Sequence, residues 1–379
     1  MPQLSAIYLD NNATTRLDER VLHAMLPYFT DLYANPSSSH LAGLEIQEAV
    51  ENAAWQTATL IGAKEEEIIF TSGATESINL AIKGLANENE NKKHIVTVAT
   101  EHKAVLETCR YMERIGFEVT YLPVTSDGII DTNLLNEVIT IKTLIVIVML
   151  TNNETGVIQD IAKMADLAHA KNALFLCDAT QAIGKISIDV KKLEIDLLAL
   201  SAHKFYGPKG VGALYISAEA KIKLTPLLNG GNQQRKLRSG TLNVPAIIGL
   251  GKASEIAVLE LYNNKKRITK LRDQLENGLL KIEGSFVNGN TQNRICNTTN
   301  ICFPGVNSEK FILALQNISV SNGSSCSSVT SQPSHVLKAL GLSDEEALSS
   351  IRFSLGRSTT SHEIEETIER VTALVAQLS

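Results

Sequence analysis

The stretch 196-DLLALSAHK-204 begins as a short apolar run and ends on a lysine. Further short apolar runs are bounded by polar turns, at 67–70, 94–98, 119–122, 143–150, 173–177 and 213–216. Continuous runs of this length are typical of strands that are buried on both faces of a mostly parallel sheet. Helical patterns lie between them, for example at 104–115, which ends at Gly116. The sequence therefore predicts an α/β architecture.

The alternation of strands and helices stops near residue 245. Residues 245–282 predict a long helix, broken near Asn263–Asn264, and later patterns predict strands at 300–303 and 351–355 and helices at 308–315 and 363–378. We assign residues 16–245 to a large domain, residues 1–15 and 265–379 to a smaller α+β domain, and helix 246–264 to the connection between them. The chain up to roughly Tyr33 is also expected to pack against the smaller domain.

Composition excludes several classes of protein. With 379 residues, 44% of them hydrophobic, the chain is long enough for two domains. A net charge of -6 does not fit a nucleic-acid-binding surface. No signal peptide is visible, and the longest apolar run is too short to cross a membrane. The five cysteines are scattered without a C-x-x-C pair, which argues against disulfides and against a structural metal, and favours a reducing cytoplasm.

Lys204 and Asp178 each follow an apolar strand. A lysine in such a sequence is more often exposed, but a buried one is a good amine for imine formation with an aldehyde cofactor. Asp178 stands where the ligand crevice of an α/β sheet is found. A carboxylate there can cap a helix, or it can keep a pyridine nitrogen protonated so that the ring accepts electrons. Gln181, three residues later, could hydrogen-bond a phenolate oxygen on the same ring.

Three other polar positions complete a candidate site. Residues 71–76, with Gly73, open a helix after a strand, which suits either anion binding or simple N-capping. His102 also follows a strand, where it could be structural or could stack on a planar cofactor and move protons. Arg352 lies inside an apolar strand, and we expect it to pair with a carboxylate, either from the protein or from a substrate.

Cys326 differs from the other cysteines because small polar residues surround it in the segment 321–328. We expect an exposed, mobile loop in which a thiolate can react. Together with Lys204, this thiol suggests that a cofactor activates a substrate and that the cysteine removes an atom from it. Cys109, Cys177 and Cys302 lie in apolar contexts that predict inert packing residues, whereas the polar surroundings of Cys296 leave its environment open.

Taken together, these segments resemble the NifS/IscS-type cysteine desulfurases. Those enzymes belong to the class V aminotransferase group and have the fold type I of pyridoxal 5′-phosphate (PLP) enzymes. The likeness runs nearly end to end, through residues 8–15, 35–40, 70–76, 100–103, 152–156, 178–181, 201–210, 238–241 and 321–342. It implies a large domain with a mostly parallel seven-stranded sheet and a smaller α+β domain.

The resemblance also implies a role for each candidate residue. Lys204 would form the imine with PLP, Asp178 would pair with the ring nitrogen, and Gln181 would meet the phenolate oxygen. His102 would stack on the ring and take part in catalysis. The phosphate would be held by Ala74, Thr75, Ser201 and His203, and by Thr241 from the partner subunit of a homodimer. Asn153 would contact the cofactor and, with Arg352, the substrate carboxylate, and Cys326 would attack the sulfur of cysteine.

The implied reaction converts L-cysteine to L-alanine and leaves the sulfur on Cys326 as a persulfide. A sulfur-acceptor or scaffold protein, in iron–sulfur cluster assembly or a thiolation pathway, would then receive it. A selenocysteine lyase, a class V aminotransferase and a non-catalytic sulfur-assembly scaffold are the alternatives, although transamination needs no thiol.

One segment departs from the family: residues 230–236 read GGNQQRK, where relatives usually read Gly-Gly-Gly-His/Gln-Glu-Arg-Gly. The departure leaves the conformation of that loop and substrate access there open.

Overall fold

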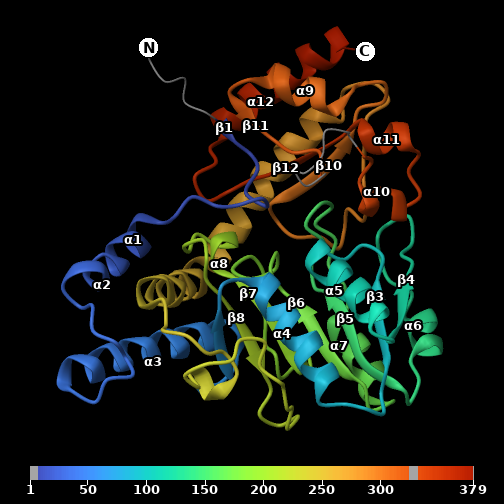
Figure 1. Ribbon diagram of the computed structural model, residues 1–379. Coiled ribbons are helices and arrows are strands. Elements are labelled where there is room, and N and C mark those ends of the chain that lie inside the picture. The colour runs from blue at the N-terminus through green and yellow to red at the C-terminus, as the bar shows by residue number, and fades with distance from the viewer. Residues whose placement is uncertain (1–6, 324–331, 379) are drawn as a thin grey trace.

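The computed structural model describes residues 7–323 and 332–378, and a seven-stranded sheet lies at its centre (Figure 1). The strands follow the order β2 (Ile68–Thr71), β8 (Gly212–Ile216), β7 (Leu197–Ser201), β6 (Leu174–Asp178), β5 (Thr143–Met149), β3 (His94–Val98) and β4 (Glu118–Leu122). β8 runs antiparallel to β2 and β7, and the other neighbours pair in parallel. All seven predicted strands and the mostly parallel sheet are therefore confirmed.

Helices cover both faces of this sheet, which is why its central strands are buried along their whole length. On one face, α4 (Ala74–Asn87) and α5 (Lys103–Arg114) pack into one hydrophobic cluster. On the other face, a second cluster takes residues from α3 (Leu41–Ile61), α6 (Thr132–Val138), α7 (Ile161–His169) and the first half of α8 (Val244–Leu279). The predicted helix at 104–115 is α5, which Gly116 follows with a φ of 93°.

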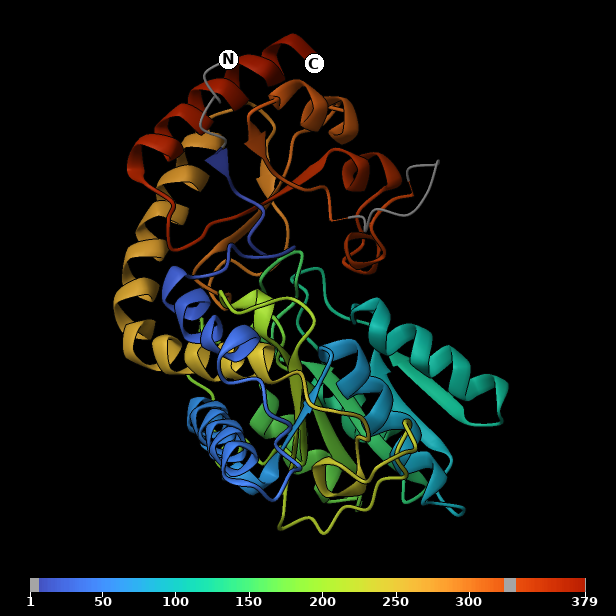
Figure 2. The same ribbon diagram turned by 60° about the vertical axis from the view of Figure 1, so that its left-hand side comes forward.

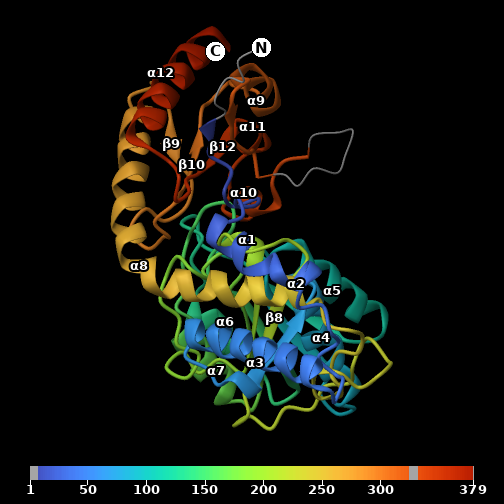
Figure 3. The ribbon, with the colours of Figure 1, turned by 90° about the vertical axis from the view of Figure 1, so that its left-hand side faces the viewer.

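Helix α8 belongs to two cores. Leu250 and Ala253 lie in the cluster under the large sheet, whereas Leu271 and Leu275 lie in a third cluster formed by the C-terminal part of the chain. The predicted break near Asn263–Asn264 is wrong, because the helix is continuous through these residues. Asparagine is only a weak helix former, and the apolar residues on both sides hold the helix in place. Figure 3 shows that α8 instead changes direction between the two cores.

The C-terminal part forms a smaller layer that lies above the large sheet in Figure 2. Its antiparallel sheet has the order β12 (Ser350–Ser354), β10 (Thr298–Cys302), β9 (Phe286–Val287), and β1 (Ile7–Tyr8) pairs in parallel with β11 (Ile318–Ser319). The helices here are α9 (Ser308–Leu315), α10 (His335–Ala339), α11 (Asp344–Leu348) and α12 (Ser361–Leu378). The strands and helices predicted after residue 282 are confirmed, and the separate cluster supports our proposal of two domains linked by α8.

The N-terminal residues divide between the two layers. Leu9 is buried in the cluster of the smaller layer. The expectation that the chain packs there as far as Tyr33 is wrong, because α1 (Glu19–Met25) and α2 (Pro27–Thr30) lie against α8. Val21 and Met25, one helical turn apart, face the core of the large sheet. None of the helices within the described residues has the length and apolar character needed to cross a membrane.

Candidate active site

The candidate residues meet at one edge of the large sheet. The strands β2, β3, β5, β6 and β7 run in the same direction, so the residues that follow them share the edge at their carboxyl ends. This edge faces the smaller layer and the segment that leads from β1 to α1 (Figure 1). The arrangement explains how residues spread over most of the chain come together.

Lys204 ends the short 3₁₀ helix η2 (Ala202–Lys204) after β7. Its Nζ donates to the carbonyl oxygens of Asn12 at 2.7 Å and Ala13 at 2.9 Å. Burial, followed by the charge of Arg352, lowers the pKa of Lys204 to about 8. The amine is thus held by neutral acceptors and loses its proton far more readily than an exposed lysine.

Asp178 is the last residue of β6, beside β7, and is only 5% exposed. Its Oδ1 accepts the backbone N–H of Thr180 at 2.9 Å, which fixes the carboxylate in the crevice. Gln181 is also buried, and its Nε2 donates to the carbonyl oxygen of Asn12 at 2.8 Å. Lys185 Nζ donates to Gln181 Oε1 at 2.9 Å, which orients the amide with its nitrogen toward Asn12.

The first turn of α4 has the features of an anion site. Its N-cap, Gly73, contributes no side chain, so no capping group occupies the N–H groups of Ala74 and Thr75. A Cβ atom at Gly73 would lie 3.5 Å from Ser201 Oγ, which places the end of β7 beside the helix start. His203 Nδ1 is 3.1 Å from Thr14 Oγ1, and burial lowers the pKa of His203 to about 4, so the ring is neutral.

His102 is the N-cap of α5, and its Nδ1 accepts the N–H of Ala104 at 3.1 Å. Burial lowers the pKa of His102, partly offset by Asp178. The preceding residue, Glu101, escaped the sequence analysis although it is fully buried. Its Oε1 accepts the N–H of Met149 at 2.6 Å, and burial, with the nearby Asp178, raises its pKa well above the ordinary value. Through this hydrogen bond, Glu101 connects the turn before α5 to the end of β5.

Arg352 has the carboxylate partner that its apolar strand demands. Arg352 Nη2 lies 2.6 Å from Asp10 Oδ1, and Nη1 donates to the carbonyl oxygen of Asn153 at 3.1 Å. The expectation of a paired arginine is confirmed, with a protein acid as the partner. Arg352 and Asn153 do lie together, next to the segment that holds Lys204, but the hydrogen bonds described for Asn153 come from its backbone.

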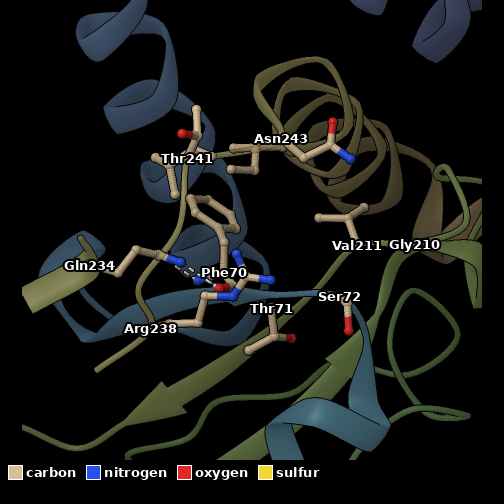
Figure 4. Close-up of a pocket in the computed structure, with 11 residues that line it drawn as sticks. Phe70, Thr71, Ser72, Gly210, Val211, Gln234, Arg238, Thr241 and Asn243 are labelled. Atoms are coloured by element: carbon tan, nitrogen blue, oxygen red, sulfur yellow. Dashed lines mark hydrogen bonds between the residues drawn. The ribbon is translucent and has the colours of Figure 1, made fainter. Parts of the chain in front are cut away.

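Thr241 lies in the segment just before α8. It is exposed and lines a pocket with Phe70, Ser72 and Arg238 (Figure 4). The side chain of Gln234 pairs with both backbone groups of Phe70, on the free edge of β2. Gln233 Oε1 accepts the N–H of Gly240 at 2.8 Å. The two glutamines of the altered segment 230–236 therefore hold the loop that carries Thr241.

The cysteines divide as predicted where the structure describes them. Cys109, Cys177 and Cys302 are buried, and burial raises the pKa of each thiol, which makes them unreactive. Cys296, whose environment the sequence left open, is buried too. The four described cysteines are free, and the described residues contain no cluster of side chains suited to a metal ion. Cys326 lies outside the described residues, so its predicted loop stays a prediction.

Known proteins share this sequence and fold. Residues 7–367 match the family model for aminotransferase class-V. The chain is 50% identical to the cysteine desulfurase IscS of Pasteurella multocida (strain Pm70), over 98% of this chain and 93% of the relative. The fold is similar to a solved NifS-like protein, with a TM-score of 0.93 and 39% identity over 98% of this chain and 100% of that one.

A second solved structure, SspA in complex with cysteine, is similar with a TM-score of 0.82 and 37% identity, over 92% of this chain and 98% of that one. The family match extends over all three sheets and over every element that supplies a candidate residue. The family model alone spans all but the ends of the sequence, and on that ground this chain belongs to the aminotransferase class-V family.

Proposed function

We propose that this protein is a PLP-dependent cysteine desulfurase that converts L-cysteine to L-alanine and takes the sulfur onto Cys326. The observation that carries the proposal is Lys204, a half-buried lysine with a lowered pKa just after β7, the strand that pairs with β6, which ends at Asp178. A chain-long likeness to enzymes named cysteine desulfurase supports the choice of reaction. The likeness to SspA in complex with cysteine supports the choice of substrate.

The residues at the carboxyl edge of the sheet fit PLP. The uncapped start of α4, with Ala74 and Thr75, would hold the phosphate together with Ser201 and His203. Asp178 would keep the pyridine nitrogen protonated, and the amide of Gln181 would face the phenolate oxygen. When bound, PLP accepts the electrons released at the substrate Cα. His102 would lie against the ring.

Lys204 is suited to proton transfer as well as to cofactor attachment. With a pKa of about 8, its amine is partly neutral near pH 7 and can take the Cα proton of the substrate. Arg352 and Asn153 would bind the substrate carboxylate. The guanidinium is already held by Asp10, so the ion pair orients it before the substrate arrives.

The sulfur step would use the thiolate of Cys326 as a nucleophile. An S–S bond forms between Cys326 and the substrate sulfur, the C–S bond of the substrate breaks, and its electron pair stays on the carbon side. Protonation of that fragment leads to alanine. The persulfide on Cys326 is then available to a sulfur-acceptor or scaffold protein, as in iron–sulfur cluster assembly or thiolation, in the cytoplasm.

We also infer a homodimer, in which Thr241 reaches the phosphate site of the neighbouring subunit. Large apolar side chains are exposed near α1, α2 and the start of α3: Leu26 (49%), Phe29 (59%), Tyr33 (79%) and Leu41 (85%). These helices lie on one side of the molecule (Figure 3). A gathering of exposed apolar residues is typical of a surface that another chain covers, and a second copy is the occupant we propose.

Lys204→Ala should remove the attachment point of PLP, because the other amine near this edge, Lys185, already donates to the carbonyl oxygen and the Oε1 of Gln181. The variant should lose the borohydride-reducible visible absorption band of the purified protein, while the exposed control Lys209→Ala keeps it. Peptide mass analysis of the reduced wild type should find the cofactor on Lys204. A reducible band that survives in Lys204→Ala would show that another residue is the anchor.

Cys326→Ala should separate cysteine binding from sulfur removal, because the thiol acts after the substrate is bound. The variant should keep the visible spectrum of the cofactor and its change on addition of L-cysteine, but form alanine at least about a hundredfold more slowly. Cys302→Ala, which removes a buried thiol far from the sheet edge, should retain activity. A Cys326→Ala enzyme that still turns over cysteine at the wild-type rate would contradict the assigned nucleophile.

Phe29→Asp should weaken the proposed dimer, because it places a charge in the middle of the apolar surface. Sedimentation equilibrium should give twice the chain mass for the wild type and a lower mass for the variant. Leu313→Asp is the control, since Leu313 is even more exposed (79%) but lies on α9 in the smaller layer. A wild type that is a fully active monomer would rule out both the interface and the partner role of Thr241.

A further inference from the structure

Glu154 is a buried acid that takes no part in the proposed binding of cofactor and substrate or in the proposed sulfur transfer. It follows Asn153 in the turn after β5, is 3% exposed, and its backbone N–H donates to Asn152 Oδ1 at 2.9 Å. Its carbonyl oxygen accepts from Asn300 Nδ2 of β10 at 3.3 Å. Both layers of the molecule therefore fix the position of this residue.

The carboxyl group of Glu154 holds the start of α10. Ser334 Oγ donates to Glu154 Oε2 at 2.5 Å, and Ser334 itself is 5% exposed. The same hydroxyl oxygen accepts the N–H groups of Val336 and Leu337 as the N-cap of α10. Because both bonding capacities of the hydroxyl are used, the chain at Ser334 is firmly attached to Glu154.

The same carboxyl group lies against the chain at Gly323. Gly323 has a φ of 78°, and a Cβ atom added to it would collide with Glu154 Oε2, so the backbone itself packs on the carboxyl group. Two residues earlier, Ser321 exchanges backbone hydrogen bonds with Arg352 of β12, at 3.2 and 2.6 Å. The chain thus reaches Glu154 from a fixed point on the smaller sheet.

We propose that Glu154 is a positioning residue that anchors the two points, Gly323 and Ser334, between which the chain carries Cys326. The inference rests on the proposed role of Cys326 as the nucleophile. Cys326 comes three residues after Gly323 and eight before Ser334, so both anchor points are close to it along the chain. Such an anchor keeps the thiol near the substrate sulfur and restricts the region that the persulfide can reach.

The carboxyl group of Glu154 is buried at an energetic cost. A buried carboxyl group is costly unless its oxygens are hydrogen-bonded. Burial raises the pKa of Glu154 to about 7, and the hydrogen bond from Ser334 and the charges of Arg352 and Lys103 oppose that shift. An apolar residue would avoid this cost, but it would leave the Ser334 hydroxyl without its acceptor.

The test measures persulfide formation on Cys326 during a single turnover with L-cysteine, in holoenzymes with changes at Glu154 or Ser334. Glu154→Ala and Ser334→Ala should each slow persulfide formation on Cys326 by about tenfold, which is the expected effect of losing a charge-assisted hydrogen bond. The cysteine concentration that half-saturates the spectral change of the cofactor should stay within about twofold, because the described hydrogen bonds of Arg352 go to Asp10 and Asn153 and not to the side chains of Glu154 or Ser334. Glu154→Gln keeps an acceptor for Ser334 and should retain most of the rate.

Ser343→Ala is the matched control for Ser334→Ala. Ser343 also caps a short helix, α11, but its partner is Glu346 rather than Glu154. This control should keep the wild-type rate of persulfide formation. The double variant Glu154→Ala/Ser334→Ala should be no slower than the slower single variant, because both changes break the same contact.

The anchoring role is overturned if Ser334→Ala and Glu154→Ala form the persulfide at the wild-type rate, or if binding of cysteine weakens as much as the rate falls. Should Glu154→Ala fail to fold, Ser334→Ala alone decides between these results. A wild type that forms no persulfide on Cys326 contradicts the proposed function and, with it, this inference. The same measurement therefore distinguishes a failure of the anchoring role from a failure of the proposed function.

Discussion

The carbonyl oxygen of Asn12 accepts hydrogen bonds from Lys204 Nζ at 2.7 Å and from Gln181 Nε2 at 2.8 Å. Asn12 is 1% exposed, and its side chain donates to Thr298 Oγ1 and to the carbonyl oxygen of Asn153. This one residue therefore connects the carboxyl edge of the large sheet with the strands of the smaller layer. Three of the candidate residues, Lys204, Gln181 and Asn153, therefore contact Asn12 directly.

The choice of acceptors around Lys204 has a chemical consequence. A carboxylate in direct contact would stabilise the ammonium form and raise the pKa of the lysine. Backbone carbonyl groups satisfy the N–H donors with less stabilisation of the charge, so burial and Arg352 dominate and the pKa falls to about 8. The Arg352–Asp10 pair, in turn, keeps the guanidinium charge compensated while it lies beside the amine. The site thus combines a reactive amine with a permanent cation.

Most of the large sheet was predictable from sequence, because its strands are buried on both faces and read as continuous apolar runs. The continuity of α8 was not predictable, since Asn263 and Asn264 are weak helix formers and the helix is held by the packing of its two ends into different cores. The location of Lys204 and Asp178 at strand ends followed from the same runs. Asn12, Glu101 and Asp10 escaped, because their roles depend on contacts with distant parts of the chain that no local pattern encodes.

The central claim is that this chain moves sulfur from L-cysteine to Cys326, and mass spectrometry of the wild-type holoenzyme tests it most directly. After treatment with L-cysteine in the absence of reductant, the peptide that contains Cys326 should gain the mass of one sulfur atom, and alanine should appear in equal amount. Iodoacetamide added before the cysteine should block both. A gain of sulfur on any other peptide, or alanine formed without sulfur bound to the protein, would contradict the account.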